Sequence, residues 1–183
     1  MPNGRLGCRL VPDDLVFDPE LVFRSLNEHH VRYVVIGGYA AILHGSPTVT
    51  LGADICAARD HENLQRLAAA LRAVHAKIRT TSEPEGVPVA LDGEFLSKMA
   101  MMNLVTDGGA FDLSFTPGAF PTGYEGLAVH AVEYDIDGLI VPVASLADVI
   151  ASKRAANRPK DLAVLPILEA LHDEVANRER RSP

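Results

Sequence analysis

The amino-acid sequence predicts a single α/β domain whose mixed β-sheet is flanked by helices. Strand-like and helix-like segments alternate along most of the chain, as is typical of α/β proteins. Two pairs of strand-like runs are joined by tight Asp-Gly turns, which require antiparallel neighbours within the sheet. The chain has 183 residues, 48% of them hydrophobic, enough for one domain with its own core. Residues 1–14 show turn formers without periodicity and predict a flexible N-terminal arm, so the domain is expected over 15–183.

The first half of the chain predicts two strands and three helices. A helix is expected over 18–30, with Asp18 as N-cap and Pro19 at its first position. The β-branched run 31–36 predicts a strand, followed by a Gly-Gly turn and a short helix that ends at Gly45. A second strand is expected over 53–58, and Asp60 is expected to cap a strongly periodic helix over 61–78.

The second half predicts two hairpins and two closing helices. Residues 80–92 contain two prolines and are expected to form a loop, and 93–99 a helical turn. The runs 101–115 and 129–144 each alternate around an Asp-Gly turn and predict the hairpins. Helices are expected over 145–156 and 159–180.

Composition restricts the function classes. The formal net charge of −7 argues against a broad nucleic-acid-coating surface, although one local basic groove remains compatible with it. Cys8 and Cys56 are far apart and indicate neither a disulfide framework nor a zinc site, so a reducing compartment is expected. No segment approaches the roughly 20 apolar residues of a membrane span, and the N-terminus lacks the apolar core of a signal peptide. A cytoplasmic protein without a membrane partner is expected.

Two features indicate phosphate chemistry. Gly37-Gly38 lies between a strand and a helix, where a phosphate could approach the backbone closely, although such a pair is more often only a tight turn. Asp54 and Asp112 each interrupt an apolar strand. Either one alone has an ordinary structural explanation, but two carboxylates on one sheet beside a glycine turn could together hold Mg²⁺.

The stretch 37–71 resembles the core of the nucleotidyltransferases of the DNA polymerase β superfamily, in the small bacterial branch of the AbiEii and MenT toxins. It reads GGYAAILHGSPTVTLGADICAARDHENLQRLAAAL. The family pattern has a glycine turn, a helix ending in His-Gly, a Ser-Pro-x-x-Thr loop, an Asp-x-Asp strand and a third carboxylate on a later strand. The tail over 152–171 is also similar, so the likeness extends over about 20–172. The matching residues are Gly37, Gly38, His44, Gly45, Ser46, Pro47, Thr50, Asp54 and Asp112.

The resemblance implies a Mg²⁺-dependent enzyme that moves an NMP group from an NTP to a hydroxyl of RNA, such as tRNA, or of a protein. A toxin with a cognate antitoxin is the implied setting. Asp54 and Asp112 would hold the metal, and with Lys153 they would form the catalytic set. Gly37, Gly38 and Lys160 would bind the nucleotide. Ser46 and Thr50 would either contact phosphate or make the hydrogen bonds of the loop's own turn.

The sequence departs from the family pattern at Gly52, where the first aspartate of the pair is usual. Glycine has no side chain to ligate a metal, and moving the register would offer Cys56, a poor ligand for Mg²⁺. In a two-metal mechanism the missing carboxylate would serve mainly the ion that activates the acceptor. Nucleotide binding should therefore survive better than catalysis, and a degenerate relative that binds nucleotide or a partner without catalysis is the alternative.

Overall fold

The computed structural model describes residues 17–181, and the predicted arm over 1–14 lies outside them. Its centre is one seven-stranded mixed sheet in the order β3-β4-β5-β2-β1-β7-β6. The pairs β1–β7 and β2–β5 are parallel, and the other neighbours are antiparallel. The strands are β1 (Tyr33–Ile36), β2 (Gly52–Ala57), β3 (Lys77–Ile78), β4 (Met101–Thr106), β5 (Gly109–Ser114), β6 (Val132–Ile136) and β7 (Leu139–Val143).

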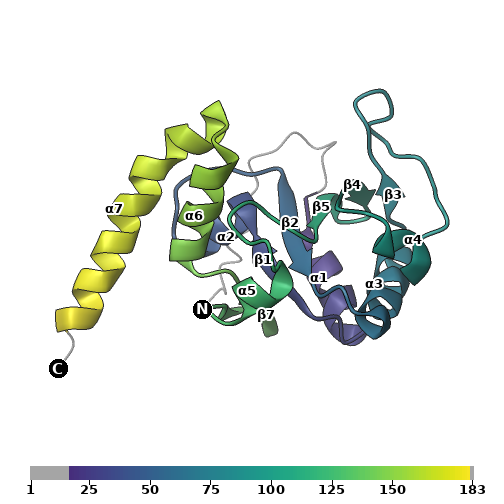
Figure 1. Cartoon of the computed structure of the whole chain (residues 1–183), viewed down its shortest axis with the longest axis horizontal. Coiled ribbons are helices and arrows are strands. Elements are labelled where there is room, and N and C mark those ends of the chain that lie inside the picture. The colour runs from purple at the N-terminus through teal and green to yellow at the C-terminus, as the bar shows by residue number, and fades with distance from the viewer. Residues whose placement is uncertain (1–16, 182–183) are drawn as a thin grey trace, which may run out of the picture.

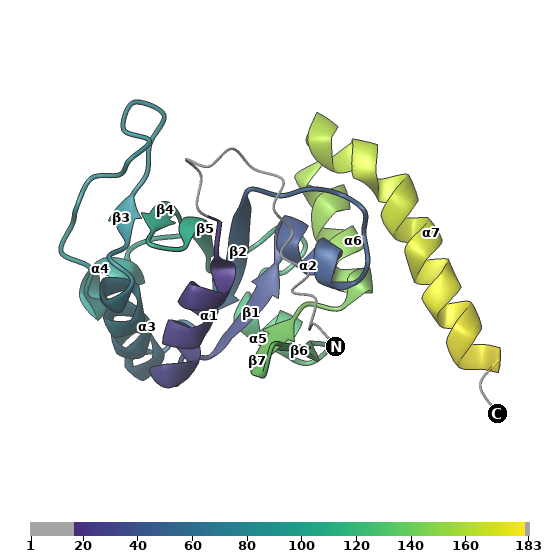
Figure 2. The same ribbon diagram turned by 180° about the vertical axis from the view of Figure 1, so that it is seen from behind.

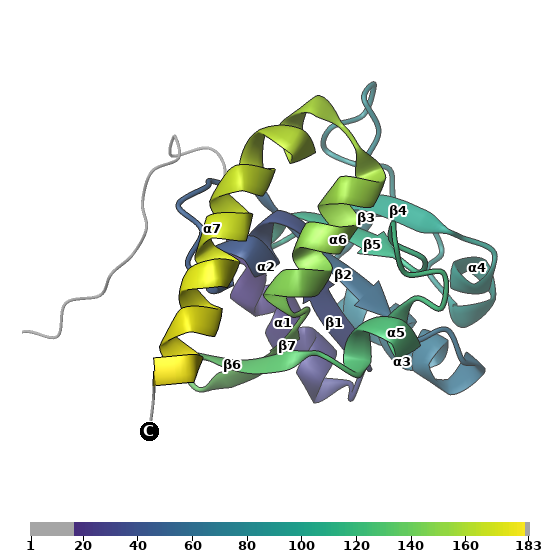
Figure 3. The ribbon, with the colours of Figure 1, turned by 60° about the vertical axis from the view of Figure 1, so that its left-hand side comes forward.

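Helices lie on both sides of this sheet, as predicted. Helices α5 and α6 lie on one side (Figure 1), and α1 and α3 cover the other (Figure 2). Helix α7 runs beside α6, and the two join at one end (Figure 3). The helices are α1 (Pro19–Glu28), α2 (Gly37–Leu43), α3 (His61–Ala73), α4 (Gly93–Ser97), α5 (Tyr124–Ala128), α6 (Leu146–Ala156) and α7 (Pro159–Arg181). No helix within 17–181 is both long and apolar enough to cross a membrane.

Strand alternation divides the sheet into a packed face and a polar face. On β5, Phe111 is buried and its ring lies 6.5 Å from that of Phe23 in α1. Because successive side chains point to opposite faces, Asp112 points away from α1. The same alternation on β2 buries Ile55 and turns Asp54 to the face of Asp112.

The predicted helix starts and hairpins are confirmed. The carboxylates of Asp18 and Asp60 accept hydrogen bonds from the backbone N–H groups of Leu21 (3.4 Å) and Asn63 (3.2 Å), as N-caps do. Strands β4 and β5 pair antiparallel around Asp107-Gly108, and β6 and β7 pair around Asp137-Gly138.

The predicted helix over 61–78 is wrong at its end. Helix α3 stops at Ala73, because His75 takes the left-handed conformation at φ 50° and Lys77–Ile78 pairs with β4 instead. Apolar residues at helical spacing continue past this point, so periodicity alone did not reveal the stop. The short helix α5 had no counterpart in the prediction.

One side-chain bridge ties α2 to the far end of the sheet. His44, at the C-terminus of α2, has Nε2 2.8 Å from the carbonyl oxygen of Ala144 and Nδ1 2.8 Å from the hydroxyl of Tyr134. A carbonyl only accepts, so Nε2 donates to Ala144, and Nδ1 accepts from the Tyr134 hydroxyl. The bridge holds α2 against β6 and the end of β7.

Replacing Tyr134 by phenylalanine removes the hydroxyl and leaves Nδ1 of His44 without its donor. We expect the free energy of unfolding to fall by about 1 kcal/mol, because the pair is partly buried. Urea denaturation of Tyr134→Phe measures it. Tyr124→Phe is the control, since the Tyr124 ring lies under the Arg32 guanidinium and keeps that contact without its hydroxyl. Equal losses in the two variants would contradict the bridge.

Candidate active site

The structure brings Asp54 and Asp112 together at the centre of the sheet. They are register partners in the parallel pair β2–β5. Neighbouring strands lie about 4.8 Å apart, and register partners share a face, so the two carboxylates stand side by side. Gly52 pairs with Ala110 one step along the same face. The position where the family pattern has its first aspartate is thus adjacent to both carboxylates and carries no side chain.

Gly37 makes room for the Asp54 carboxylate. It begins α2 with φ 71°, a conformation that favours glycine, and a Cβ there would lie 2.9 Å from Asp54 Cγ. Gly38 packs against Thr50, whose Oγ1 would lie 3.2 Å from a Cβ on Gly38. Gly37 is therefore required by its backbone conformation and its contact with the Asp54 carboxylate, and a side chain on Gly38 would be tight against Thr50. Its use as a phosphate cradle remains a prediction.

A cavity of about 330 Å³ opens beside Asp54. Its walls come from distant parts of the chain: the start of α2, the segment before β2, β2 itself, and the junction of α6 with α7. This size is in the range of small-molecule sites. The lining residues are Gly37, Gly38, Ala41, Thr48, Val49, Thr50, Asp54, Lys153, Arg158, Lys160, Asp161, Val164 and Leu168.

Three cationic side chains gather on the α6–α7 side of this cavity. Lys153 Nζ lies 3.3 Å from Asp161 Oδ1, and Arg158 Nε lies 2.5 Å from Asp161 Oδ2. Asp161 is only 2% exposed. Burial opposes its ionisation, but the hydrogen bonds from Arg158 and Lys153 outweigh burial and hold its pKa below the ordinary value. Lys160 completes the cationic wall.

The pKa of Asp54 lies above the ordinary value of an aspartate. Burial raises its pKa to about 6, and the neighbouring Asp112 carboxylate acts in the same direction. Lys153, the backbone N–H of Gly38 and Lys160 oppose the rise. Because burial and the second carboxylate both oppose ionisation of Asp54, a positive charge placed between the two carboxylates would stabilise them.

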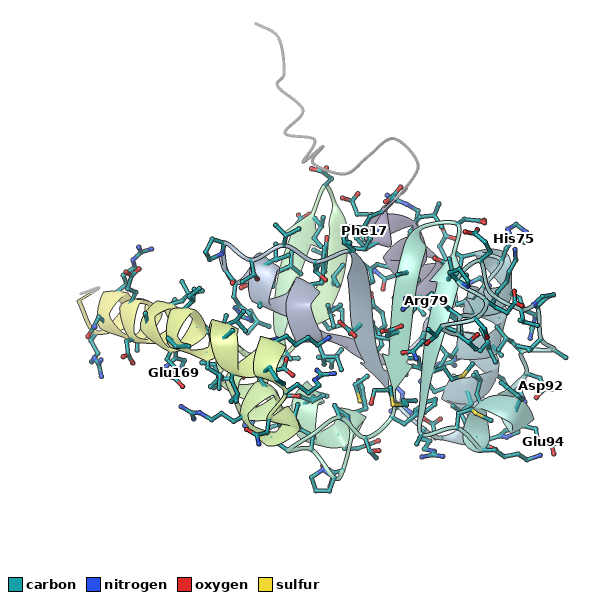
Figure 4. All side chains as sticks on the ribbon, turned by 90° about the horizontal axis from the view of Figure 1, so that it is seen from above. Phe17, His75, Arg79, Asp92, Glu94 and Glu169 are labelled. Carbon is teal, nitrogen blue, oxygen red and sulfur yellow. The ribbon has the colours of Figure 1, made fainter. Side chains whose placement is uncertain are left out.

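Arg79 is the site residue that the sequence reasoning missed. It follows β3, and its Nη2 lies 3.1 Å from Asp112 Oδ1. Figure 4 shows Arg79 over the strands of the sheet. A lone arginine after a two-residue strand carries no motif, and its closeness to Asp112 arises only from the pairing of β3, β4 and β5. No sequence signal could have identified it.

The remaining predicted residues divide into those at the cavity and those away from it. Thr50 lines the cavity, while its Oγ1 donates to the carbonyl oxygen of Gly52 at 2.9 Å. Ser46 is buried, does not line the cavity, and lies 3.0 Å from the Thr48 hydroxyl. Arg154, a further cation near the end of α6, does not line this cavity and pairs with Glu169 on α7, which is labelled in Figure 4. Thr50 thus makes a hydrogen bond of its own turn and lines the cavity, where contact with a phosphate stays a prediction, whereas Ser46 makes only the contact within the turn.

The donor set fits one Mg²⁺ and does not fit two. Mg²⁺ is usually held by one or two carboxylates together with substrate phosphates and water, and Asp54 with Asp112 offers that number. A second ion would need the carboxylate absent at Gly52, and Asp112 already accepts from Arg79. Among the described residues, no three acidic, histidine or cysteine side chains form a metal-binding group.

Comparison with solved structures identifies the fold. The chain superposes on the lincosamide antibiotic adenylyltransferase LnuA, solved with lincomycin bound, with a TM-score of 0.55 and 15% identity over 85% of this chain and 98% of that one. The predicted mixed α/β fold is thereby confirmed as one shared with a nucleotidyltransferase. The finer resemblance to the AbiEii and MenT toxins stays a prediction.

Two further solved structures match the chain with lower TM-scores, and comparison of sequences found no match. A proposed nucleotidyltransferase from Thermotoga maritima gives a TM-score of 0.47 and 18% identity over 86% of this chain and 90% of that one. The antibiotic-resistance factor ANT(2'')-Ia gives 0.48 and 12% over 88% and 90%. Neither a protein-family model nor a curated protein sequence matches the chain.

The raised pKa of Asp54 predicts how stability depends on pH without metal. The pKa of Asp54 is about 6 in the folded protein against an ordinary value of 3.8, so protonation of Asp54 stabilises the fold at low pH, and this contribution is lost as the pH rises from 3.8 through 6. From pH 5 to pH 8 the loss is about 1.4 kcal/mol. Asp54→Asn cannot ionise and should not show it.

Urea denaturation of both proteins in EDTA at pH 5 and pH 8 measures this difference. The wild type should lose stability relative to Asp54→Asn as the pH rises. A constant difference between the two proteins would show that Asp54 is an ordinary carboxylate. Both proteins share the titrating groups distant from Asp54, so the contributions of those groups cancel in the comparison.

Proposed function

We propose that this chain transfers a nucleotidyl group from an NTP to a hydroxyl, with one Mg²⁺ held by Asp54, Asp112 and the triphosphate. The main observation behind the proposal is the cavity, which three cations and Asp54 line together. Gly37 and Gly38 also line it, and their backbone carries no side chains there. Bound Mg²⁺ would offset phosphate charge on the carboxylate side. The resemblance in sequence and the shared fold support the same reaction.

The cavity walls suit the two ends of a nucleotide. Lys153, Arg158 and Lys160 offer positive charge to a triphosphate, which carries several negative charges. Val164 and Leu168 of α7 give the cavity an apolar side, where a base could pack. We therefore place the phosphates between Asp54 and the α6–α7 junction, and the base against α7.

The transfer step needs an acceptor on the Asp112 side. The acceptor oxygen attacks the α-phosphorus, the bond from this phosphorus to the bridging oxygen breaks, and pyrophosphate leaves with the electron pair. Because Asp112 Oδ1 faces Arg79 and Oδ2 is the oxygen left for Mg²⁺, we assign the hydroxyl proton to bulk water. The proposed acceptor is RNA, such as tRNA, or a protein, and the proposed setting is a toxin with its antitoxin.

A second candidate is a relative that binds nucleotide or a partner without transferring anything. Gly52 favours it, because the first carboxylate of the family pattern is missing from an otherwise suitable face. The ion pair between Arg79 and Asp112 favours it as well, because the third carboxylate is already engaged. This candidate retains the nucleotide cavity and differs only in the chemistry.

Incubation with each of the four α-labelled NTPs and Mg²⁺ separates the two candidates. Total RNA, total protein and lincomycin are offered as acceptors in parallel, the last because LnuA is a lincosamide adenylyltransferase. Label in RNA or protein, lost in Asp112→Asn, supports the proposed acceptors. Label in lincomycin alone would replace them with a small molecule. Nucleotide binding without label in any arm favours the non-catalytic candidate.

Lys160 provides a test of the nucleotide site. Lys160→Ala should weaken ATP binding about fivefold, or about 1 kcal/mol, because one exposed cation is lost from the phosphate side. The melting temperature should change little, because Lys160 is exposed. Lys153 is a poorer probe, since it pairs with the buried Asp161 and its loss would also destabilise the fold.

Arg154→Ala is the matched control for this titration. It removes the same charge from the same helix pair, but Arg154 contacts Glu169 and does not line the cavity. Isothermal titration calorimetry with ATP and Mg²⁺ should leave its affinity within twofold of the wild type. Equal weakening in both variants would indicate a general field effect of charge rather than a local phosphate site.

A further inference from the structure

Polar side chains form one row across four neighbouring positions of the sheet. Asp54 pairs in register with Asp112, and Asp112 with Asn103 of β4. Beyond β3, the backbone N–H of Arg79 donates to the carbonyl oxygen of Asn103 at 2.8 Å, which continues the ladder to the sheet edge. Register partners share a face, so Arg79 can extend along the polar face and over Asn103 to reach Asp112.

Among the described residues, one nitrogen of the Arg79 guanidinium has a hydrogen-bond partner and another has none. Nη2 donates to Asp112 Oδ1, and the side chains of Arg79 and Asp112 are 35% and 36% exposed. Nε of Arg79, by contrast, is buried and has no hydrogen-bond partner among residues 17–181. A buried N–H group without a hydrogen-bond partner destabilises the fold, and an ion pair that is this exposed contributes little stability. Stability alone therefore gives a poor reason for the arrangement.

We propose that Arg79 is a positioning residue whose guanidinium takes the place of the acceptor-side metal ion, so that the site works with one Mg²⁺. This proposal rests on the proposed function. It adds that Arg79 compensates for the metal ligand that is missing at Gly52. Three carboxylates with two divalent ions carry one net positive charge, and two carboxylates with one divalent ion and one guanidinium carry the same. The loss of a carboxylate and the gain of Arg79 thus together offset the charge of the absent second ion.

The space around the row agrees with this substitution. Gly52 and Ala110 leave the face beside the two carboxylates without bulk, so the guanidinium meets no neighbouring acid other than Asp112 in the row. Arginine suits the task better than lysine, because its planar group stays charged and can hold a carboxylate while it presents other N–H groups to a phosphate. Arg79 would fix Asp112 and face the acceptor side of the α-phosphate.

The number of bound ions tests the proposal without any acceptor. Mn²⁺ binding is counted by electron paramagnetic resonance in the presence of the α,β-methylene analogue of ATP. We expect one ion in the wild type and one in Gly52→Asp, because Arg79 still occupies Asp112. Gly52→Asp combined with Arg79→Ala should bind two. Gly52 does not have a positive φ, and a Cβ there would lie 3.2 Å from the Ala110 carbonyl oxygen, so a shift of a few tenths of an ångström admits the new side chain.

Gly52→Asp combined with Arg66→Ala is the control, since Arg66 pairs with Glu62 on the exposed side of α3. It should bind one ion. Two ions in the wild type, or one in the Arg79 double variant, would overturn the proposal for Arg79 and leave nucleotide binding intact. A wild type that does not bind the analogue would overturn the proposed function and this proposal together.

A rate measurement keeps the proposal testable if the double variant does not fold. Arg79→Gln should lower the rate of nucleotide transfer at saturating NTP by at least about tenfold, while the dissociation constant of the analogue stays within threefold. Arg79→Lys keeps the charge without the planar group and should retain more of the rate than Arg79→Gln. An unchanged rate in Arg79→Gln would overturn the proposal.

Discussion

The candidate site depends on the parallel pairing of β2 with β5. This pairing places Asp54 and Asp112 in register at neighbouring positions of one face, far apart though they are in sequence. The consequences spread from there. Burial and the second acid make Asp54 hard to ionise, Gly37 must lack a side chain to receive the Asp54 carboxylate, and cations from α6 and α7 lie beside the same cavity. A slip of one residue in this register would turn one carboxylate into the core.

Local chemistry explains what the sequence revealed about the fold. Asp18 and Asp60 predict helix starts because a short carboxylate caps the N–H groups three residues on, and an Asp-Gly pair predicts a hairpin because it suits a tight turn. These signals involve only a few neighbouring residues. The end of α3 was predicted wrongly because residues 77–78 are fixed by pairing with β4, a contact that periodicity cannot detect.

The residues of the site also divide into those that motifs predict and those whose position depends on tertiary contacts. Asp54, Asp112, Lys153 and Lys160 were predicted through motifs, and the structure brings Asp54 and the two lysines to one cavity, with Asp112 beside Asp54. Arg79 could not be separated from surface residues in advance, and although the resemblance implies Arg158 as a cation of the nucleotide site, it implies Arg154 equally. The positions of Arg79 and Arg158 follow from strand order and from the α6–α7 junction, and Arg154, close by in sequence, does not line the cavity.

Asp161 has a consequence for which ligands the cavity can select. This buried carboxylate holds Lys153 and Arg158 in place before any ligand binds, so ligand binding loses little further side-chain entropy at these two residues. It also competes for the same N–H donors. An incoming anion must share these cations with Asp161, which a ligand with several charged oxygens does far better than one with a single phosphate. If a nucleotide binds here as proposed, a triphosphate would therefore be favoured over a nucleoside monophosphate.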